Sequence, residues 1–202
     1  MTGKKKLGIL LVAIVLGIIL CLFVVTKIKD RGGVVVKCNS DFPVNEKLVA
    51  YRQDDAAWKN DKIGESKYTM GSSGCIITSI ATALSSTSVA MDPGAMNKFL
   101  SKNNAFDEAG NLQWGRIDEI NGLYADVYSD VSSEIIDNCL AAGHYPIIKI
   151  HRKSIFSYHH YVIIIGTENG EYVCMDPLQD HLTRLSDYND KIYAIRCVYY
   201  EK

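Results

Sequence analysis

A single cysteine stands where a glycine-bracketed turn runs into an apolar helix. Residues 71–75 read Gly-Ser-Ser-Gly-Cys, and residues 76–84 are mostly small or apolar. The free N–H groups and the positive dipole end of a helix N-terminus stabilise a thiolate relative to a thiol. Glycines before the cysteine would let a substrate approach closely, because they carry no side chain. We therefore predict that Cys75 is a nucleophile, although a buried core cysteine at a helix start would show the same local pattern.

Two further segments supply the residue types that a thiol nucleophile needs. Residues 160–166 begin with a histidine and continue as an apolar strand, and residues 171–176 form a second strand that ends on Asp176. A histidine can take the thiol proton and later protonate the leaving group, while a carboxylate orients the imidazole. Considered singly, His160 could be an ordinary edge histidine and Asp176 a turn residue before proline.

Four motifs, taken together in order, resemble a known family. They are Tyr51-Arg52-Gln53-Asp54-Asp55-Ala56-Ala57-Trp58, Gly71-Ser72-Ser73-Gly74-Cys75, His160-Tyr161 and Met175-Asp176-Pro177. The chain resembles the papain-like peptidases of the bacteriocin-processing type. It is more closely similar to their stand-alone relatives in Gram-positive bacteria, the family-thirty-nine-like cysteine peptidases. This resemblance covers roughly residues 49–199 and implies a papain-like fold, in which the cysteine-bearing helix packs on an antiparallel sheet that carries the histidine and the acid.

The resemblance also assigns roles to four residues. Cys75 matches the nucleophile, His160 the general base and later acid, and Asp176 the residue that orients the imidazole. Gln53 matches the side chain that donates to the oxyanion, with the Cys75 backbone N–H as the second donor. Gln53 precedes Cys75 by 22 residues, farther than in the exporter-linked peptidases, because residues 59–69 intervene. The resemblance implies no metal and no cofactor.

The turn between the two strands decides which histidine faces the aspartate. Side chains alternate between the faces of a sheet, so His159 and His160 point to opposite faces. A three-residue loop at residues 168–170 would place Asp176 on the face of His160, whereas a two-residue turn without a bulge would place it on the face of His159. The resemblance assigns His160, so we predict the three-residue loop.

The beginning of the chain is strongly apolar. Residues 7–25 form an uninterrupted apolar run of 19 residues that follows three lysines. At about 1.5 Å per residue, a helix of this length crosses one bilayer core. No small-residue cleavage pattern follows, so we predict a short cytoplasmic tail and a retained transmembrane signal anchor over residues 1–29, with the C-terminal part outside the cytoplasm. Basic residues flank both ends, so the positive-inside rule alone does not fix the orientation.

The rest of the chain is long enough for one domain with one core. We expect a stalk at residues 30–47 with a brief strand at 34–36, and the peptidase domain at residues 48–202. An α+β fold is favoured over alternating βαβ units, because helices come first and strands last. The expected helices span about residues 75–84, 93–101 and 133–142, and the expected antiparallel strands span residues 146–150, 160–166, 171–176, 182–185 and 192–199.

The charge of the chain limits the kinds of partner it can bind, and its cysteine count indicates a free thiol. Residues 32–202 carry 16 basic and 22 acidic residues, a formal charge of −6, so a nucleic-acid partner is not expected. Five cysteines in this part leave at least one free thiol outside the cell. Cys139, Cys174 and Cys197 lie in helix or strand patterns, where cysteine often packs as a small hydrophobe. The spacing does not show whether any of them form a disulfide.

Together these observations predict a membrane-anchored, extracytoplasmic cysteine peptidase that hydrolyses peptide or amide bonds through an acyl-enzyme. Its substrate would be a secreted leader peptide or a peptidoglycan stem peptide, and a separate exporter would be a partner. Two alternatives keep the fold: a catalytically silent module that binds a peptide or cell-wall component, and a thiol acyltransferase. A zinc site of His159, His160 and Cys174 is disfavoured, because no paired Cys-x-x-Cys or His-x-x-x-His spacing supports it.

Overall fold

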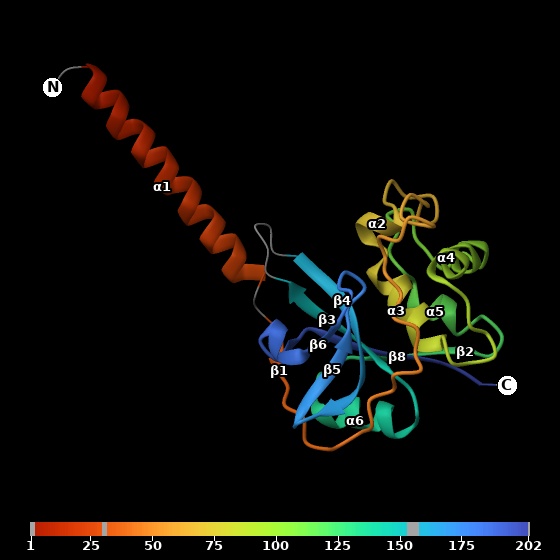
Figure 1. Cartoon of the computed structure of the whole chain (residues 1–202). Coiled ribbons are helices and arrows are strands. Elements are labelled where there is room, and N and C mark those ends of the chain that lie inside the picture. The colour runs from red at the N-terminus through yellow and green to blue at the C-terminus, as the bar shows by residue number, and fades with distance from the viewer. Residues whose placement is uncertain (1–2, 30–31, 153–157, 202) are drawn as a thin grey trace. The chain divides into compact units, whose positions relative to one another are not determined.

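The computed structural model describes residues 3–29, 32–152 and 158–201, and the chain divides into two compact units, Met1–Gly33 and Val34–Lys202. The first unit contains one helix, α1 (Gly3–Lys29) (Figure 1). Within the described part of the chain, no helix meets the length and apolarity needed to cross a membrane. The anchor expected over residues 7–25 therefore stays a prediction from the sequence.

The second unit is built on a six-stranded antiparallel sheet with strand order β2-β8-β3-β4-β5-β6. A separate two-stranded ribbon pairs β1 with β7. The α+β class expected from the order of helices and strands is confirmed. The strands are β1 (Val34–Val35), β2 (Leu123–Tyr128), β3 (Pro146–Arg152), β4 (Tyr158–Glu168), β5 (Glu171–Met175), β6 (Leu182–Arg184), β7 (Lys191–Ile192) and β8 (Ala194–Tyr200).

Helices cover both faces of the six-stranded sheet, because its central strands are apolar on both sides. On one face, Ile147 and Ile163 pack into the same hydrophobic cluster as residues of the first helices. On the other face, Ile148 and Val162 pack with Ile136. Figure 1 shows α2, α3, α4 and α5 grouped together and α6 apart from them. These helices are α2 (Met70–Ser73), α3 (Cys75–Leu84), α4 (Pro93–Lys102), α5 (Trp114–Ile117) and α6 (Ser133–Ala141), with a 3-10 helix η1 (Leu185–Tyr188) late in the chain.

Polar side chains cap two of these helices where the sequence predicts it. Asp92 Oδ1 accepts a hydrogen bond from the Ala95 N–H at 2.7 Å, and Pro93 occupies the first helical position of α4. Ser132 Oγ accepts one from the Ile135 N–H at 3.3 Å at the start of α6. Each cap satisfies an N–H group that has no partner inside the helix.

Residues 34–47, expected to form a stalk, instead pack on the second unit. The β1 strand pairs with β7, and Val36 is buried beside them. Farther on, the Asn45 N–H donates to the Ile165 carbonyl at 3.0 Å, and the Thr167 N–H donates to the Phe42 carbonyl at 2.9 Å. The compact unit therefore begins at Val34 and not at residue 48, because backbone groups of this segment find partners on β4 and β7.

A disulfide joins Cys139 of α6 to Cys197 of β8. These two cysteines do not pack as separate small hydrophobes, as their local patterns favour, but form a covalent link between a helix and the sheet. Cys174 is a buried free thiol, whereas Cys38 and Cys75 are free and half-buried. The fold therefore leaves Cys75 as a free thiol with access to solvent.

Candidate active site

Cys75 is the first residue of α3. The short helix α2 leads directly into it, and the Gly74 N–H donates to the Met70 carbonyl at 2.7 Å where the two helices meet. A ten-residue helix thus presents the thiol at its N-terminus, where backbone N–H groups are not used inside the helix. This position favours negative charge on sulfur.

The glycines beside Cys75 are required by the packing of the chain itself. A Cβ atom added at Gly74 would lie 2.5 Å from the Met70 carbonyl oxygen and 2.9 Å from Met70 Cα. One added at Gly71 would lie 3.0 Å from the Lys59 carbonyl oxygen. The space next to both glycines is therefore filled by the protein's own backbone and is not left open for a substrate, contrary to the expectation from the motif.

The turn between β4 and β5 differs from the predicted one. Glu168 pairs with Glu171, so the connection is a two-residue turn of Asn169 and Gly170, with φ angles of 53° and 76°. Two successive positive φ angles match the right-handed twist of a tight hairpin. The predicted three-residue loop is wrong.

A bulge in β4 nevertheless brings the aspartate to the predicted face. The register shifts by one residue between Ile164 and Gly166, so that Ile163 pairs with Met175. Asp176 follows Met175 and therefore comes to the face of His160. The extra residue lies within the strand and not in the turn, but its effect on the register is the same.

The structure brings Cys75, His160 and Asp176 together. His160 is 1% exposed, and its Nε2 lies 2.6 Å from Asp176 Oδ1. The Cys75 side chain lies close enough to the same imidazole to contribute to its raised pKa. Because the carboxylate holds Nε2, Nδ1 is the ring nitrogen that remains available to a thiol. The arrangement is that of a nucleophile, a base and an orienting acid.

Asp176 is held from several sides. Its Oδ1 also accepts a hydrogen bond from the Leu178 N–H at 2.8 Å, and its Oδ2 accepts one from the Tyr188 hydroxyl at 2.8 Å. Arg152 Nη1 lies 3.8 Å from Oδ2. The carboxylate side chain has no solvent exposure. A buried carboxylate with this many donors is fixed in orientation and stays ionised.

Burial and hydrogen bonding act in opposite directions on the two ionisable groups of this pair. Burial lowers the pKa of His160, but the hydrogen bond to Asp176, the nearby Cys75 side chain and the charge of Asp176 outweigh burial and raise that pKa to about 9. Burial raises the pKa of Asp176, but the bonds from His160, Leu178 and Tyr188 outweigh it and hold that pKa below its usual range. Both shifts favour an imidazolium beside a carboxylate.

Gln53 lies between the two halves of the site. Its backbone N–H donates to the Pro177 carbonyl at 3.0 Å, and its side-chain Nε2 donates to the Gly71 carbonyl at 3.0 Å. Gln53 is 3% exposed, and its Oε1 accepts no hydrogen bond from the described residues. Gln53 therefore ties the turn before Cys75 to the segment that follows Asp176, and one Nε2 hydrogen is already donated to Gly71.

Cys75 opens onto a hollow of about 430 Å³. Its walls come from the start of α3, from strand β4 and from the loop before α5. Among the residues that the structure describes, no charged side chain lines it, and four of its lining residues are Tyr68, Leu112, Trp114 and Tyr161. The Arg196 guanidinium lies 5.4 Å from the Trp114 ring centroid. The hollow suits an uncharged group, because a charged side chain placed there would find no counter-ion in its walls.

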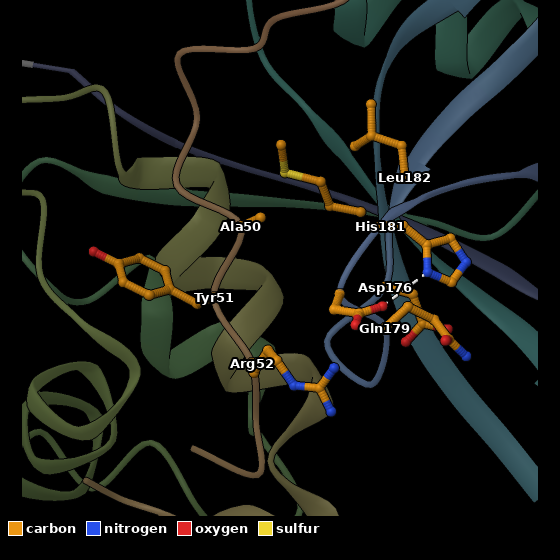
Figure 2. Close-up of a pocket in the computed structure, with 9 residues that line it drawn as sticks. Ala50, Tyr51, Arg52, Asp176, Gln179, His181 and Leu182 are labelled. Carbon is orange, nitrogen blue, oxygen red and sulfur yellow. Dashed lines mark hydrogen bonds and ion pairs between the residues drawn. The ribbon is translucent and has the colours of Figure 1, made fainter. Parts of the chain in front are cut away.

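A second hollow of about 410 Å³ lies on the Asp176 side of the site (Figure 2). Figure 2 shows Arg52 extending toward the segment that carries Asp176 and Gln179, while Tyr51 points away from it. Arg52 is paired with Asp54 through two hydrogen bonds of 2.9 Å. The cysteine and the aspartate thus each border a separate hollow.

The zinc alternative finds no support in the site geometry. His160 Nε2 is occupied by Asp176, and burial raises the pKa of the Cys174 thiol. A metal ligand would need the thiolate. In the described ranges, no group of three His, Cys, Asp or Glu side chains is arranged to hold a metal ion.

The sequence reasoning missed two residues of this site, Tyr188 and Arg152. Tyr188 lies 12 residues after Asp176 on η1, and Arg152 ends β3. Neither belongs to a motif with a recognisable spacing. Only the Asx-like contact of Asp176 with the Leu178 N–H follows a local pattern that the sequence displays.

Comparison with known proteins supports the fold. A crystal structure of a Bacillus anthracis protein described as a candidate C39-like peptidase matches with a TM-score of 0.51 and 12% sequence identity. The match covers 81% of this chain and 100% of that chain. No family model and no curated protein matches the sequence. At this identity the likeness is one of fold, and the second unit thus has an α+β fold similar to that of a C39-like peptidase.

Proposed function

We propose that the protein is a cysteine peptidase that hydrolyses peptide or amide bonds through Cys75, His160 and Asp176. The observation that carries the proposal is the connected arrangement of these three side chains. A free thiol at a helix N-terminus lies near a buried imidazole and helps to raise its pKa, and a fully buried carboxylate holds that imidazole at 2.6 Å. The similarity in fold to a candidate C39-like peptidase supports the same class.

In the first step, the Cys75 thiolate attacks the substrate carbonyl carbon and the carbonyl oxygen becomes an oxyanion. The Cys75 backbone N–H and the second Nε2 hydrogen of Gln53 are the proposed oxyanion donors. As the C–N bond breaks, His160 gives its proton to the leaving amine and a thioester remains. In the second step, His160 removes a proton from water, and the resulting attack releases the carboxylic acid and regenerates the thiolate beside the imidazolium.

A peptide substrate with an uncharged residue next to the scissile bond fits the hollow beside Cys75. A secreted leader peptide or a peptidoglycan stem peptide remains the proposed substrate class, and a separate exporter the proposed partner. Membrane attachment through residues 7–25 with an extracytoplasmic catalytic domain is likewise proposed. The Cys139–Cys197 disulfide supports that location, because disulfides persist in oxidising compartments.

Alkylation of the free cysteines by iodoacetamide at different pH values, with mass mapping of the labelled peptides, tests the activated thiol. We expect Cys75 to be labelled rapidly below pH 7, and His160→Ala to abolish this. Cys38 is an internal control, because burial raises its pKa and it should label only at higher pH. Equal labelling of Cys75 and Cys38 at every pH would reject the catalytic proposal in favour of a silent binding module.

Hydrolysis of a fluorogenic peptide library by the wild type and by Cys75→Ser then tests the reaction itself. We expect turnover by the wild type, with neutral side chains preferred over charged ones, and a loss of at least about a thousandfold in the variant. Release of product that does not depend on Cys75 would refute the assignment.

A further inference from the structure

A tyrosine hydroxyl contacts the Asp176 carboxylate through the oxygen that does not bind His160. Tyr188 ends η1 and is 8% exposed. Its hydroxyl oxygen lies 2.8 Å from Asp176 Oδ2 and 3.0 Å from Thr183 Oγ1. The Asp176 bond to His160 uses the other carboxylate oxygen, Oδ1. The phenol and the imidazole therefore share one carboxylate without competing for the same atom.

The direction of the tyrosine hydrogen bond follows from the number of protons. A phenol has one proton to donate, and an ionised carboxylate can only accept. The Tyr188 proton therefore points to Asp176, because a hydrogen bond to an ionised acceptor is about twice as strong as one to a neutral hydroxyl. Thr183 then donates its own proton to the Tyr188 oxygen at 3.0 Å, because the alternative acceptor, the Cys174 carbonyl, is farther away at 3.5 Å.

We propose that Tyr188 is a positioning residue of the site, whose hydroxyl fixes the Asp176 carboxylate and withdraws negative charge from it, so that the His160 imidazolium remains acidic enough to protonate the leaving group. The inference rests on the proposed peptidase function. Tyr188 acts through Asp176 and does not itself touch the reacting atoms.

The effect of Tyr188 on catalysis depends on how far the pKa of His160 is already raised. A general acid works best when its pKa lies near the operating pH. With the pKa of His160 raised to about 9, any further increase makes the imidazolium a weaker acid. Without the Tyr188 hydrogen bond, the carboxylate would carry more charge toward His160 and raise that pKa again.

Other groups around Asp176 act in both directions and must stay unchanged in the test. Arg152 and Arg52 supply positive charge near Asp176, while Asp187 supplies negative charge near Cys174. A conservative change at Tyr188 leaves all of them in place. Among the described residues, the titratable and charged groups near the Asp176–His160 pair include Arg52, Cys75, Arg152, Tyr158, Cys174, Asp187 and Tyr188.

The fold contains a matched control for this tyrosine. Tyr172 is also buried, at 1% exposure, and packs in the same hydrophobic cluster. Its hydroxyl donates to a carboxylate oxygen of Asp137 at 2.8 Å, the same distance as in the Tyr188 bond. Tyr188→Phe and Tyr172→Phe therefore remove the same hydroxyl from a similar environment, but only the first change touches Asp176.

The experiment measures the pKa of His160 by NMR titration of protein with labelled histidines, in the wild type, Tyr188→Phe and Tyr172→Phe. The His160 signals are assigned by their loss in His160→Ala. We expect Tyr188→Phe to raise the pKa of His160 by about half a unit, and to lower kcat/KM about fivefold on a peptide that the wild type cleaves. Tyr172→Phe should change neither quantity.

The titration needs no substrate, so it separates this inference from the proposed function. A raised pKa in Tyr188→Phe alone supports the role of Tyr188 even if no peptide is cleaved. An unchanged pKa, or the same change in both tyrosine variants, would overturn it even if the wild type is an active peptidase. If Tyr188→Phe does not fold, Thr183→Val keeps the phenol and should give a smaller shift in the same direction, whereas no shift would refute the inference.

Discussion

The bulge in β4 places His160 and Asp176 on one face, so a side chain added at the bulge tests how the site is built. Gly166 has a φ of +149°, a conformation that residues with side chains rarely adopt. A Cβ atom there would lie 2.6 Å from the Pro43 carbonyl oxygen and 2.7 Å from Val44 Cα. Hydrogen bonds from Asn45 to Ile165 and from Thr167 to Phe42 hold this segment across the bulge.

These contacts allow the cost of Gly166→Ala to be worked out. Strained backbone of this kind costs about 1–3 kcal/mol. Forcing an extra carbon against packed atoms adds about 1–3 kcal/mol, and here the neighbours are backbone atoms of residues 43 and 44, which cannot rotate away. The free energy of unfolding should therefore fall by about 2–6 kcal/mol, a large part of the total for a domain of this size.

Urea unfolding followed by circular dichroism measures this change, and Gly170→Ala is the matched control in the same hairpin. Gly170 also has a positive φ, of 76°, but a Cβ atom there would meet nothing within 4 Å. Its substitution should cost only the backbone strain, about 1–2 kcal/mol. Equal losses in the two variants would refute the idea that the close approach of residues 43–44 requires glycine at the bulge.

Two further predictions concern charge and covalent links. The pKa of His160 is raised to about 9 in the folded state. The interactions of the protonated imidazole therefore stabilise the fold fully below pH 6.5, by up to about 3 kcal/mol. This stabilisation is lost as the pH rises through 9. Urea unfolding between pH 6 and pH 9.5 measures that loss, which should be much smaller in Asp176→Asn; an unchanged slope in the variant would contradict the assignment. The disulfide spans 58 residues, so replacing Cys139 and Cys197 by serine should lower the free energy of unfolding by about 4 kcal/mol. Adding a reductant should destabilise the wild type but not this double variant, and equal effects on both would argue against the link.

Much of the fold was predictable because its signals are local. The caps at Asp92 and Ser132 act on N–H groups three residues away, and apolar strands read directly as runs in the sequence. The order of Cys75, His160 and Asp176 along the chain could also be recognised from the sequence alone. Strand β2 was not predicted, because only Leu123 and Ala125 of its six residues are buried and the segment has no apolar run.

Distant parts of the chain decided the rest. The sequence of the hairpin permits the extra residue either in the turn or within the strand. In the structure it lies within the strand, and the backbone of residues 43–44 packs against Gly166 at this bulge, although the two segments are more than 120 residues apart. The hydrogen bond from Tyr188 to Asp176 and the disulfide between Cys139 and Cys197 likewise follow no local sequence pattern. The sequence by itself determined which residues can do chemistry, because residue type and local periodicity are written along the chain. Only the tertiary structure decided their register and their supporting contacts, because these depend on close approaches between segments that no local pattern records.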